Sequence, residues 1–201
     1  MMVSCSKQDA VQNSVYQTIL GRDGGSNSGA IIRRPVYRAF IPEFWIRKDP
    51  STDESIADTM RPLVEFFIPT SEGEVRLTVY NFPYESLDER IPPAAQIARW
   101  RQQSSLEEPL SARETRCAHD GFSGIYLEGP ELLAWAMQLC PEHFRSLQRP
   151  GSLEQRQFLS QLRADYTIKA TGSVEAIQRA KNSIELFSNS FQLIQEIPTP
   201  L

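Results

Sequence analysis

Three residues of the types that form a catalytic triad lie close together in the sequence. Cys117, His119 and Asp120 are a nucleophile, a base and a carboxylate that could orient the base. Strand geometry argues against that chemistry, because residues two apart point the same way, whereas each member of a triad is aimed at the next from a separate element. No glycine-rich oxyanion loop accompanies them. We therefore expect no catalysis at these residues.

Other catalytic and metal-binding patterns are also missing from the sequence. The acidic pairs lie next to each other in loops, whereas glycosidases hold two carboxylates at a defined separation across a cleft; these pairs are Glu107 with Glu108 and Asp88 with Glu89. No Walker loop, dinucleotide fingerprint or His-Glu-x-x-His is present. The histidines and cysteines do not have a zinc-ligand spacing. We expect neither an enzyme nor a metal or cofactor.

A cluster of two cations and one aromatic residue is a candidate binding feature. Arg99, Trp100 and Arg101 could bind an acidic protein partner through their charges and the indole ring. The structural interpretation is that Trp100 and Ile97, three residues apart on a helix, are core, and that the arginines are its solvated rim. We favour the structural interpretation and keep the binding interpretation as the alternative.

Cys5 is a candidate site of lipid attachment. It follows Met2, Val3 and Ser4, and this order of an apolar residue, a small residue and a cysteine is typical of the end of a bacterial lipoprotein signal. A complete signal also has a basic segment and about 7–15 apolar residues before the cleavage site. The alternative is an accidental cysteine near the end of a cytosolic protein. We expect Cys5 to carry a lipid that anchors the chain to a membrane.

The remaining cysteines allow two interpretations. Cys117 and Cys140 could pair in an oxidising envelope. Most unpaired cysteines are instead small buried hydrophobic residues, which is the interpretation we favour.

Composition limits the class of protein. The 201 residues are 40% hydrophobic and include three tryptophans and ten phenylalanines, enough for a core of ordinary size. A net charge of −4 argues against general binding of nucleic acid, which needs a basic surface. No apolar stretch approaches the length of a spanning helix, so any membrane attachment would come from lipid or from a partner.

The sequence divides into a tether and one domain. Residues 1–34 are expected to hold the lipid-attachment cysteine and a flexible tether, because residues 21–29 are rich in glycine, serine and asparagine. A short helix over residues 11–20 is suggested by apolar residues at helical spacing. The domain is expected to cover residues 35–197.

Alternation, turns and capping signals predict the elements of the domain. The expected strands cover residues 36–41 (an edge or opening strand), 63–68, 74–80, 114–119, 123–127 and 163–170. The helices are expected at residues 54–60, 93–103 and 132–139, and in a long closing stretch from Ser173 to just before Pro198. Residues 143–156 give no clear prediction.

Several segments resemble bacterial proteins related to PsbP and to the Ran-binding Mog group. The helix at residues 94–103 resembles their Asn-x-x-Arg-Trp-x-x-Gln helix, and residues 166–172 are similar to their late strand with its lysine and glycine. Residues 40–45 resemble their early strand, although Phe44 stands where glycine is usual and Ala95 where the asparagine would be. The helical stretch expected near residues 132–140 is another departure.

The resemblance implies a fold rather than a task. It implies an α+β fold, an α/β/α sandwich whose central antiparallel sheet carries helices on both faces. Our leading hypothesis is a lipid-anchored protein of the bacterial cell envelope that acts as a non-catalytic binding or assembly module. The alternative is a soluble cytosolic adaptor that resembles the Mog group and binds another protein.

Overall fold

The computed structural model describes most of the chain in five stretches. They are residues 14–22, 33–49, 60–104, 112–147 and 153–194. Cys5 and residues 54–59 of the helix expected at residues 54–60 lie outside these stretches, and Met60 is in a turn. Among the described helices, none is long and apolar enough to cross a membrane.

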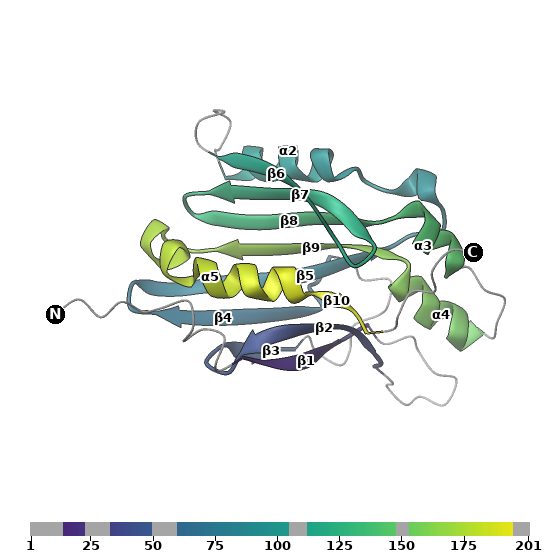
Figure 1. Cartoon of the computed structure of the whole chain (residues 1–201), viewed down its shortest axis with the longest axis horizontal. Helices are drawn as coiled ribbons and strands as arrows, with labels where there is room; N and C mark the ends of the chain where they lie inside the picture. Colours follow the sequence, from purple (N-terminus) through teal and green to yellow (C-terminus); the bar gives the residue numbers. More distant parts are fainter. Residues whose placement is uncertain (1–13, 23–32, 50–59, 105–111, 148–152, 195–201) are drawn as a thin grey trace.

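The centre of the molecule is a seven-stranded sheet in which every neighbouring pair is antiparallel. Its spatial order is β3 (Ile46–Lys48), β4 (Val64–Thr70), β5 (Gly73–Pro83), β9 (Ala164–Thr171), β8 (Leu132–Leu139), β7 (Phe122–Gly129) and β6 (Arg113–His119). The last of these seven strands along the chain, β9, is therefore the middle strand of the sheet (Figure 1).

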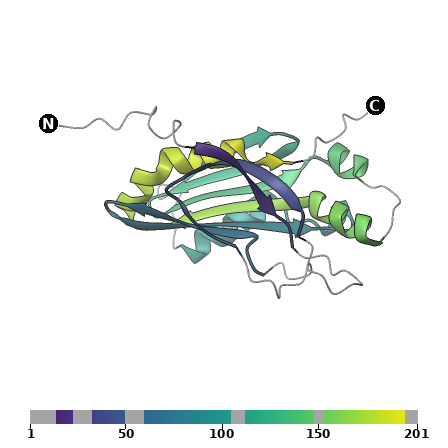
Figure 2. The ribbon, with the colours of Figure 1, turned by 90° about the horizontal axis from the view of Figure 1, so that it is seen from below.

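Both faces of this sheet are covered. One face carries α5 (Val174–Ser190) and a three-stranded sheet of β1 (Ser14–Leu20), β2 (Pro35–Pro42) and β10 (Gln192–Leu193). The other face carries α2 (Pro93–Gln103), as Figure 2 shows. Shorter helices, η1 (Leu87–Glu89), α3 (Pro141–Ser146) and α4 (Leu153–Leu162), lie in the connections. The α+β fold with a central antiparallel sheet and helices on both faces is confirmed.

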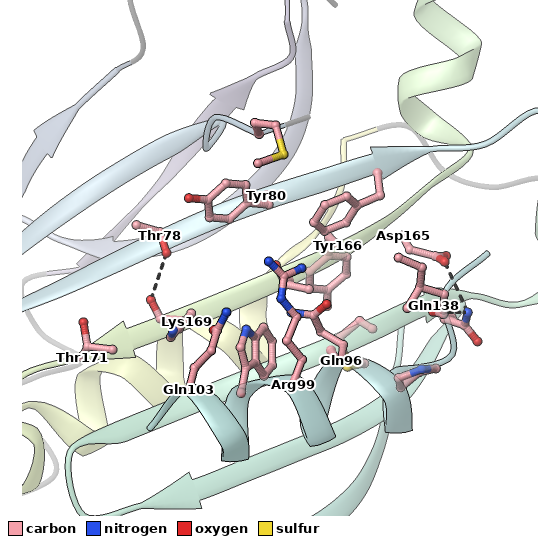
Figure 3. Close-up of a pocket in the computed structure, with 18 of the residues that line it drawn as sticks. Thr78, Tyr80, Gln96, Arg99, Gln103, Gln138, Asp165, Tyr166, Lys169 and Thr171 are labelled. Atoms are coloured by element: carbon pink, nitrogen blue, oxygen red, sulfur yellow. Dashed lines mark hydrogen bonds between the residues drawn. The ribbon is translucent and has the colours of Figure 1, made fainter. Parts of the chain in front are cut away.

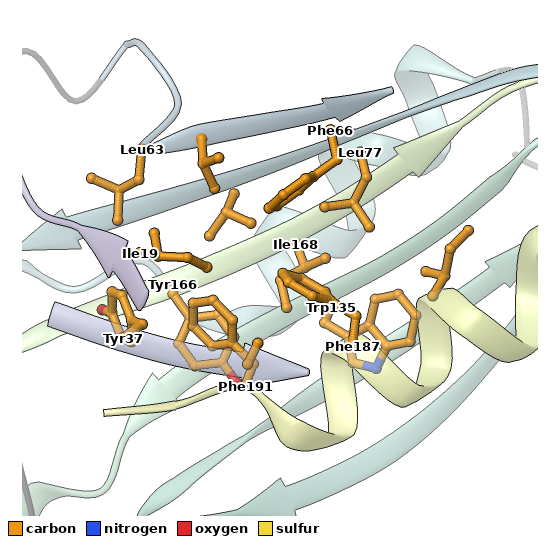
Figure 4. Packing of buried hydrophobic residues seen from close by; sticks show 14 of the residues in the cluster. Ile19, Tyr37, Leu63, Phe66, Leu77, Trp135, Tyr166, Ile168, Phe187 and Phe191 are labelled. Atoms are coloured by element: carbon orange, nitrogen blue, oxygen red, sulfur yellow. The ribbon is translucent and has the colours of Figure 1, made fainter. Parts of the chain in front are cut away.

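Aromatic side chains fill the main core, between the large sheet and the layer of α5 and the small sheet (Figure 4). The Phe191 ring lies 4.6 Å from the rings of both Tyr37 and Tyr166, measured between centroids. Phe187 on α5 contacts Trp45 and Phe66 at 5.4 and 5.5 Å. These contacts attach the helix and the small sheet to the strands beneath them.

A smaller core lies under α2 on the opposite face. Ile97 and Trp100 are 2% and 4% exposed, and they pack on Leu127, Leu132, Ala134 and Ala136 of β7 and β8. The structural interpretation of Trp100 agrees with this burial.

The helix expected over residues 132–139 is wrong, because this segment is strand β8. Seven of its eight residues are buried, since α2 covers one face of the strand and the main core covers the other. A strand buried on both faces shows no alternation of apolar and polar residues. The segment Leu-Leu-Ala-Trp-Ala-Met-Gln-Leu is also rich in good helix formers.

Part of the segment expected as a tether is folded onto the domain. The short helix expected at residues 11–20 is instead strand β1, which pairs antiparallel with β2. Gly21 is buried beside Gln161 and Val36 so tightly that a Cβ atom would lie 2.3 Å from the Gln161 Oε1 atom. Arg22 is 2% exposed, and its guanidinium donates to the side chain of Asn81 and to the Arg61 carbonyl. Residues 23–32 lie outside the described stretches.

Three smaller differences concern the position of a strand in its sheet, the end of a helix and the stretch that gave no clear prediction. Strand β2 is the middle strand of the small sheet rather than an edge strand. The closing helix begins as expected, with the Ser173 hydroxyl accepting from the Ala176 amide, but it ends at Ser190 and is followed by β10. In the stretch that gave no clear prediction, the chain forms α3 and the start of α4.

Replacing Trp100 by alanine tests the small core. We expect Trp100→Ala to lower the free energy of unfolding by about 3–5 kcal/mol, because it leaves a cavity under α2. Urea unfolding followed by circular dichroism measures the change. The matched control is Gln102→Ala, an exposed position on the same helix, which should stay within about 0.5 kcal/mol of the wild type. Equal stability of the two variants would contradict the core position of Trp100.

Candidate functional site

The candidate site is a cavity of about 390 Å³ between α2 and the outer face of the large sheet. We call it the α2 groove (Figure 3). The sheet residues that line it are Arg76, Thr78, Tyr80 and Phe82 on β5, Asp165, Tyr166, Thr167, Lys169 and Thr171 on β9, and Ala136, Met137 and Gln138 on β8. This volume falls in the range of small-molecule sites in proteins.

The alternation of strand residues explains why these side chains face the groove. On β9, Tyr166, Ile168 and Ala170 are fully buried and belong to the main core. The residues between them point to the opposite face, as the period of two of a strand requires. Asp165, Thr167 and Lys169 therefore form the floor of the groove.

The other wall is one face of α2. Gln96, Arg99 and Gln103 line the groove, and their spacing of three and four residues places them on a single stripe of the helix. Figure 3 shows them extending from α2 toward the strands. The neighbouring stripe holds Ile97 and Trp100, which reach the small core, and Trp100 also lines the groove.

Two cations stand in the groove without a neutralising partner among the described residues. Arg99 and Lys169 both line it, and neither makes a salt bridge within the part of the chain that the structure describes. Burial lowers the pKa of Lys169, and the positive charge of Arg99 lowers it further. The two positive charges therefore repel each other, and the electrostatic potential of this part of the groove is positive.

The groove's carboxylate is neutralised by a buried arginine. Asp165 accepts hydrogen bonds from the Arg90 guanidinium, with the Nε atom at 3.0 Å, and from the Leu139 amide at 3.0 Å. Both side chains of the pair are less than 10% exposed. Burial raises the pKa of Asp165, and the hydrogen bonds and charge of Arg90 oppose that increase. Arg90 also donates to the Leu139 carbonyl at 2.7 Å, so this pair ties the loop before α2 to β8 and β9.

The arginine–tryptophan–arginine cluster of the sequence is divided by the structure. Arg99 and Trp100 line the groove, whereas Arg101 points elsewhere. The Arg101 Nε atom lies 2.6 Å from a carboxylate oxygen of Glu114, and a terminal nitrogen lies 3.1 Å from the Ala112 carbonyl. Arg101 therefore joins α2 to β6.

Sequence reasoning missed most of the groove. The sequence patterns place Lys169, Asp165 and Tyr80 only on strands, and Gln96 and Gln103 only on a helix. A usable signal was present in the polar stripe of α2 and in the polar positions of β9. Nothing in the sequence showed that these two polar faces lie opposite each other.

Cys117 and His119, two of the residues that suggested a triad, contact other side chains and the backbone of the fold instead of each other. The Cys117 sulfur lies 3.4 Å from the Met137 sulfur, and burial raises the pKa of the thiol, which disfavours the nucleophilic thiolate. The His119 Nε2 atom lies 2.7 Å from the Tyr166 hydroxyl and 3.0 Å from the Phe191 carbonyl, and burial lowers the pKa of the ring. Cys117 and Cys140 are both unpaired. Within the described stretches, no group of three or more acidic, histidine or cysteine side chains is placed to hold a metal ion.

Comparison with known proteins gives one structural neighbour to report. No family model and no curated protein matches the chain. The chain is similar to the solution structure of cyanobacterial PsbP from Synechocystis sp. PCC 6803, with a TM-score of 0.39 and 12% sequence identity. The match covers 88% of this chain and 94% of that chain. The strand order and layers described above define the fold independently of this match.

Removing the Arg90 guanidinium tests the buried ion pair. Arg90→Met leaves the Asp165 carboxylate buried without its cation, and we expect it to lower the free energy of unfolding by about 3–5 kcal/mol near neutral pH. Without Arg90 the pKa of Asp165 rises further above that of an unfolded aspartate, about 3.9. The stability contribution of such a group is fully present below the unfolded pKa and is lost as the pH rises.

The difference in stability between wild type and Arg90→Met should therefore be larger at pH 7 than at pH 4. Urea unfolding at the two pH values measures it. Adding Asp165→Asn to Arg90→Met should remove the extra pH dependence. A penalty that is equal at both pH values would show that the charge of Asp165 is not what Arg90 neutralises.

Proposed function

We propose that this protein is a non-catalytic binding module whose α2 groove holds its ligand. The observation that carries the proposal is the convergence of polar side chains from two walls, α2 and β9, beside the aromatic rings of Trp100 and Tyr80. A mostly preformed concave site with a few convergent polar groups is the usual form of a ligand site.

The groups in the groove suit binding better than covalent or acid–base chemistry. Its described lining contains no histidine, cysteine or serine, which are the usual bases and nucleophiles. Asp165, the carboxylate among the described lining residues, is already engaged by Arg90 and by the Leu139 amide. These side chains can orient and neutralise a ligand.

We further propose that the module is anchored by lipid to the bacterial cell envelope through Cys5. The support is the order Met2, Val3, Ser4 and Cys5. Since β1 begins at Ser14, only eight residues, 6–13, separate Cys5 from the folded domain. Anchored there, the domain would lie close to the membrane surface. The cytosolic protein-binding adaptor is the alternative that the following lipid test distinguishes.

Substituting Cys5 tests the anchor. In the organism's own cells, the full-length protein should take up radiolabelled palmitate and enter the detergent phase, and Cys5→Ala should abolish both because it removes the acceptor thiol. Cys140→Ala is the matched control and should keep both. An unlabelled, soluble wild-type protein would contradict the anchor and favour the cytosolic adaptor.

Blocking the groove tests the binding function. The wild-type protein, isolated from its own cells and denatured, should release a ligand that mass spectrometry detects. Gln103→Trp places a large side chain at the mouth of the groove, so its preparation should contain at least tenfold less of that ligand. Gln178→Trp, at an exposed position on α5, is the control and should retain it. Equal ligand content in both variants, with unchanged melting temperatures, would contradict binding in the groove.

A further inference from the structure

We propose that the α2 groove takes a small organic anion with a flat apolar body. The anionic group, a carboxylate or phosphate, would lie between Arg99 and Lys169, and the body would lie against Tyr80 and Phe82. This inference rests on the proposed binding function and adds the chemical class of the ligand.

The charge distribution is the first support. Arg99 on the helix wall and Lys169 on the sheet floor both line the groove, and neither forms a salt bridge with another described residue. The chain as a whole carries a net charge of −4, so this local positive charge opposes the overall sign. Lys169 is half-buried and Arg99 is exposed. The positive charge of Arg99 acts on Lys169, and an anion bound by both side chains removes this repulsion.

The other charged side chains of the groove are already neutralised within the fold. Asp165 pairs with Arg90 at one end. Arg76 pairs with Glu65, with the two atoms 2.7 Å apart, at the other end. The uncompensated positive charge is thereby confined to the middle of the groove. A ligand with a single anionic group matches this pattern better than one with charge along its length.

Aromatic surface next to the cations is the second support. Tyr80 stacks nearly parallel to Phe82 on β5, with 6.3 Å between centroids and 10° between ring planes. Trp100 also lines the groove but is only 4% exposed, so the accessible apolar surface comes mainly from Tyr80, Phe82 and Ile91, the last being 52% exposed near the start of α2. Flat apolar groups pack well on such rings, so the groove offers an apolar surface beside its charged centre.

The size of the groove sets the scale of the ligand. Its volume of about 390 Å³ lies at the lower end of the range for small-molecule sites, about 300–1,000 Å³. A folded partner would not fit inside it. An acidic peptide segment is the other occupant that the experiment must separate, because it would also meet the two cations.

Three naphthalene probes of similar size test the charge requirement. They are 2-naphthoate, the neutral 2-naphthamide and the cationic 2-naphthylmethylammonium, and isothermal titration calorimetry measures their dissociation constants with the full-length protein. We expect 2-naphthoate to bind about tenfold more tightly than the amide, as one charge-assisted hydrogen bond would produce. The cation should bind most weakly.

Two substitutions locate the anionic group. Arg99→Gln and Lys169→Gln should each reduce the preference for 2-naphthoate over 2-naphthamide severalfold and leave the affinity for the amide nearly unchanged. Arg179→Gln, at an exposed position on α5 on the opposite face, is the control and should keep the full preference. Melting temperatures show whether each variant is folded. Because Arg99 lies on α2 and Lys169 on β9, one folded variant is enough for the test if the other does not fold.

Each contrary result overturns the inference. Equal binding of acid and amide, stronger binding of the ammonium probe, or no binding of any probe would exclude an anion-selective groove. Binding of a glutamate-rich heptapeptide but not of 2-naphthoate would replace the small anion by an acidic peptide. A neutral or cationic ligand recovered with the wild-type protein and lost in Gln103→Trp would overturn the ligand class but leave the binding function intact, so the two failures are distinguishable.

Discussion

The alternation of side chains along β9 is the constraint on which the rest of the structure depends. This strand is the middle member of the large sheet, with the main core on one face and the α2 groove on the other. Its inward residues, Tyr166, Ile168 and Ala170, are fully buried in the main core. Its outward residues include Asp165, Thr167 and Lys169, which line the α2 groove. A slip of one residue in its pairing would exchange the two sets and would destroy the core and the groove together.

The groove also requires that α2 stay at a fixed distance from the sheet. Ile97 and Trp100 anchor one stripe of the helix in the small core. The ion pair of Arg90 and Asp165 fixes the segment just before the helix to the sheet. The polar stripe that includes Arg99 is thereby held over β9 without being drawn down onto it. The same helix can thus stabilise the fold and present charged groups to a ligand.

The fold was predictable wherever a segment carries a local signal, such as alternation of apolar and polar residues or a turn. Flanking prolines located β4, alternation located β5 and β9, and the Asp120-Gly121 pair located the hairpin between β6 and β7, where both residues adopt the positive φ angles of 45° and 81° that such a turn requires. Prediction failed for β8, because burial on both faces removes the alternation. It also failed for β1, because its pairing with β2 joins residues that are not neighbours in the sequence and local patterns give no information about such pairing.

The candidate site was likewise predictable only where local sequence patterns are sufficient. The sequence by itself determined which side chains share a face: the polar stripe of α2, the polar positions of β9 and the apolar stripe that includes Trp100. Those assignments depend only on the 3.6-residue and two-residue periods of the backbone. Only the tertiary structure decided that Arg99 and Lys169 line the same cavity and that Arg101 pairs with Glu114 instead. The residues of each pair are brought together by packing between separate elements, and the local periods carry no information about such packing.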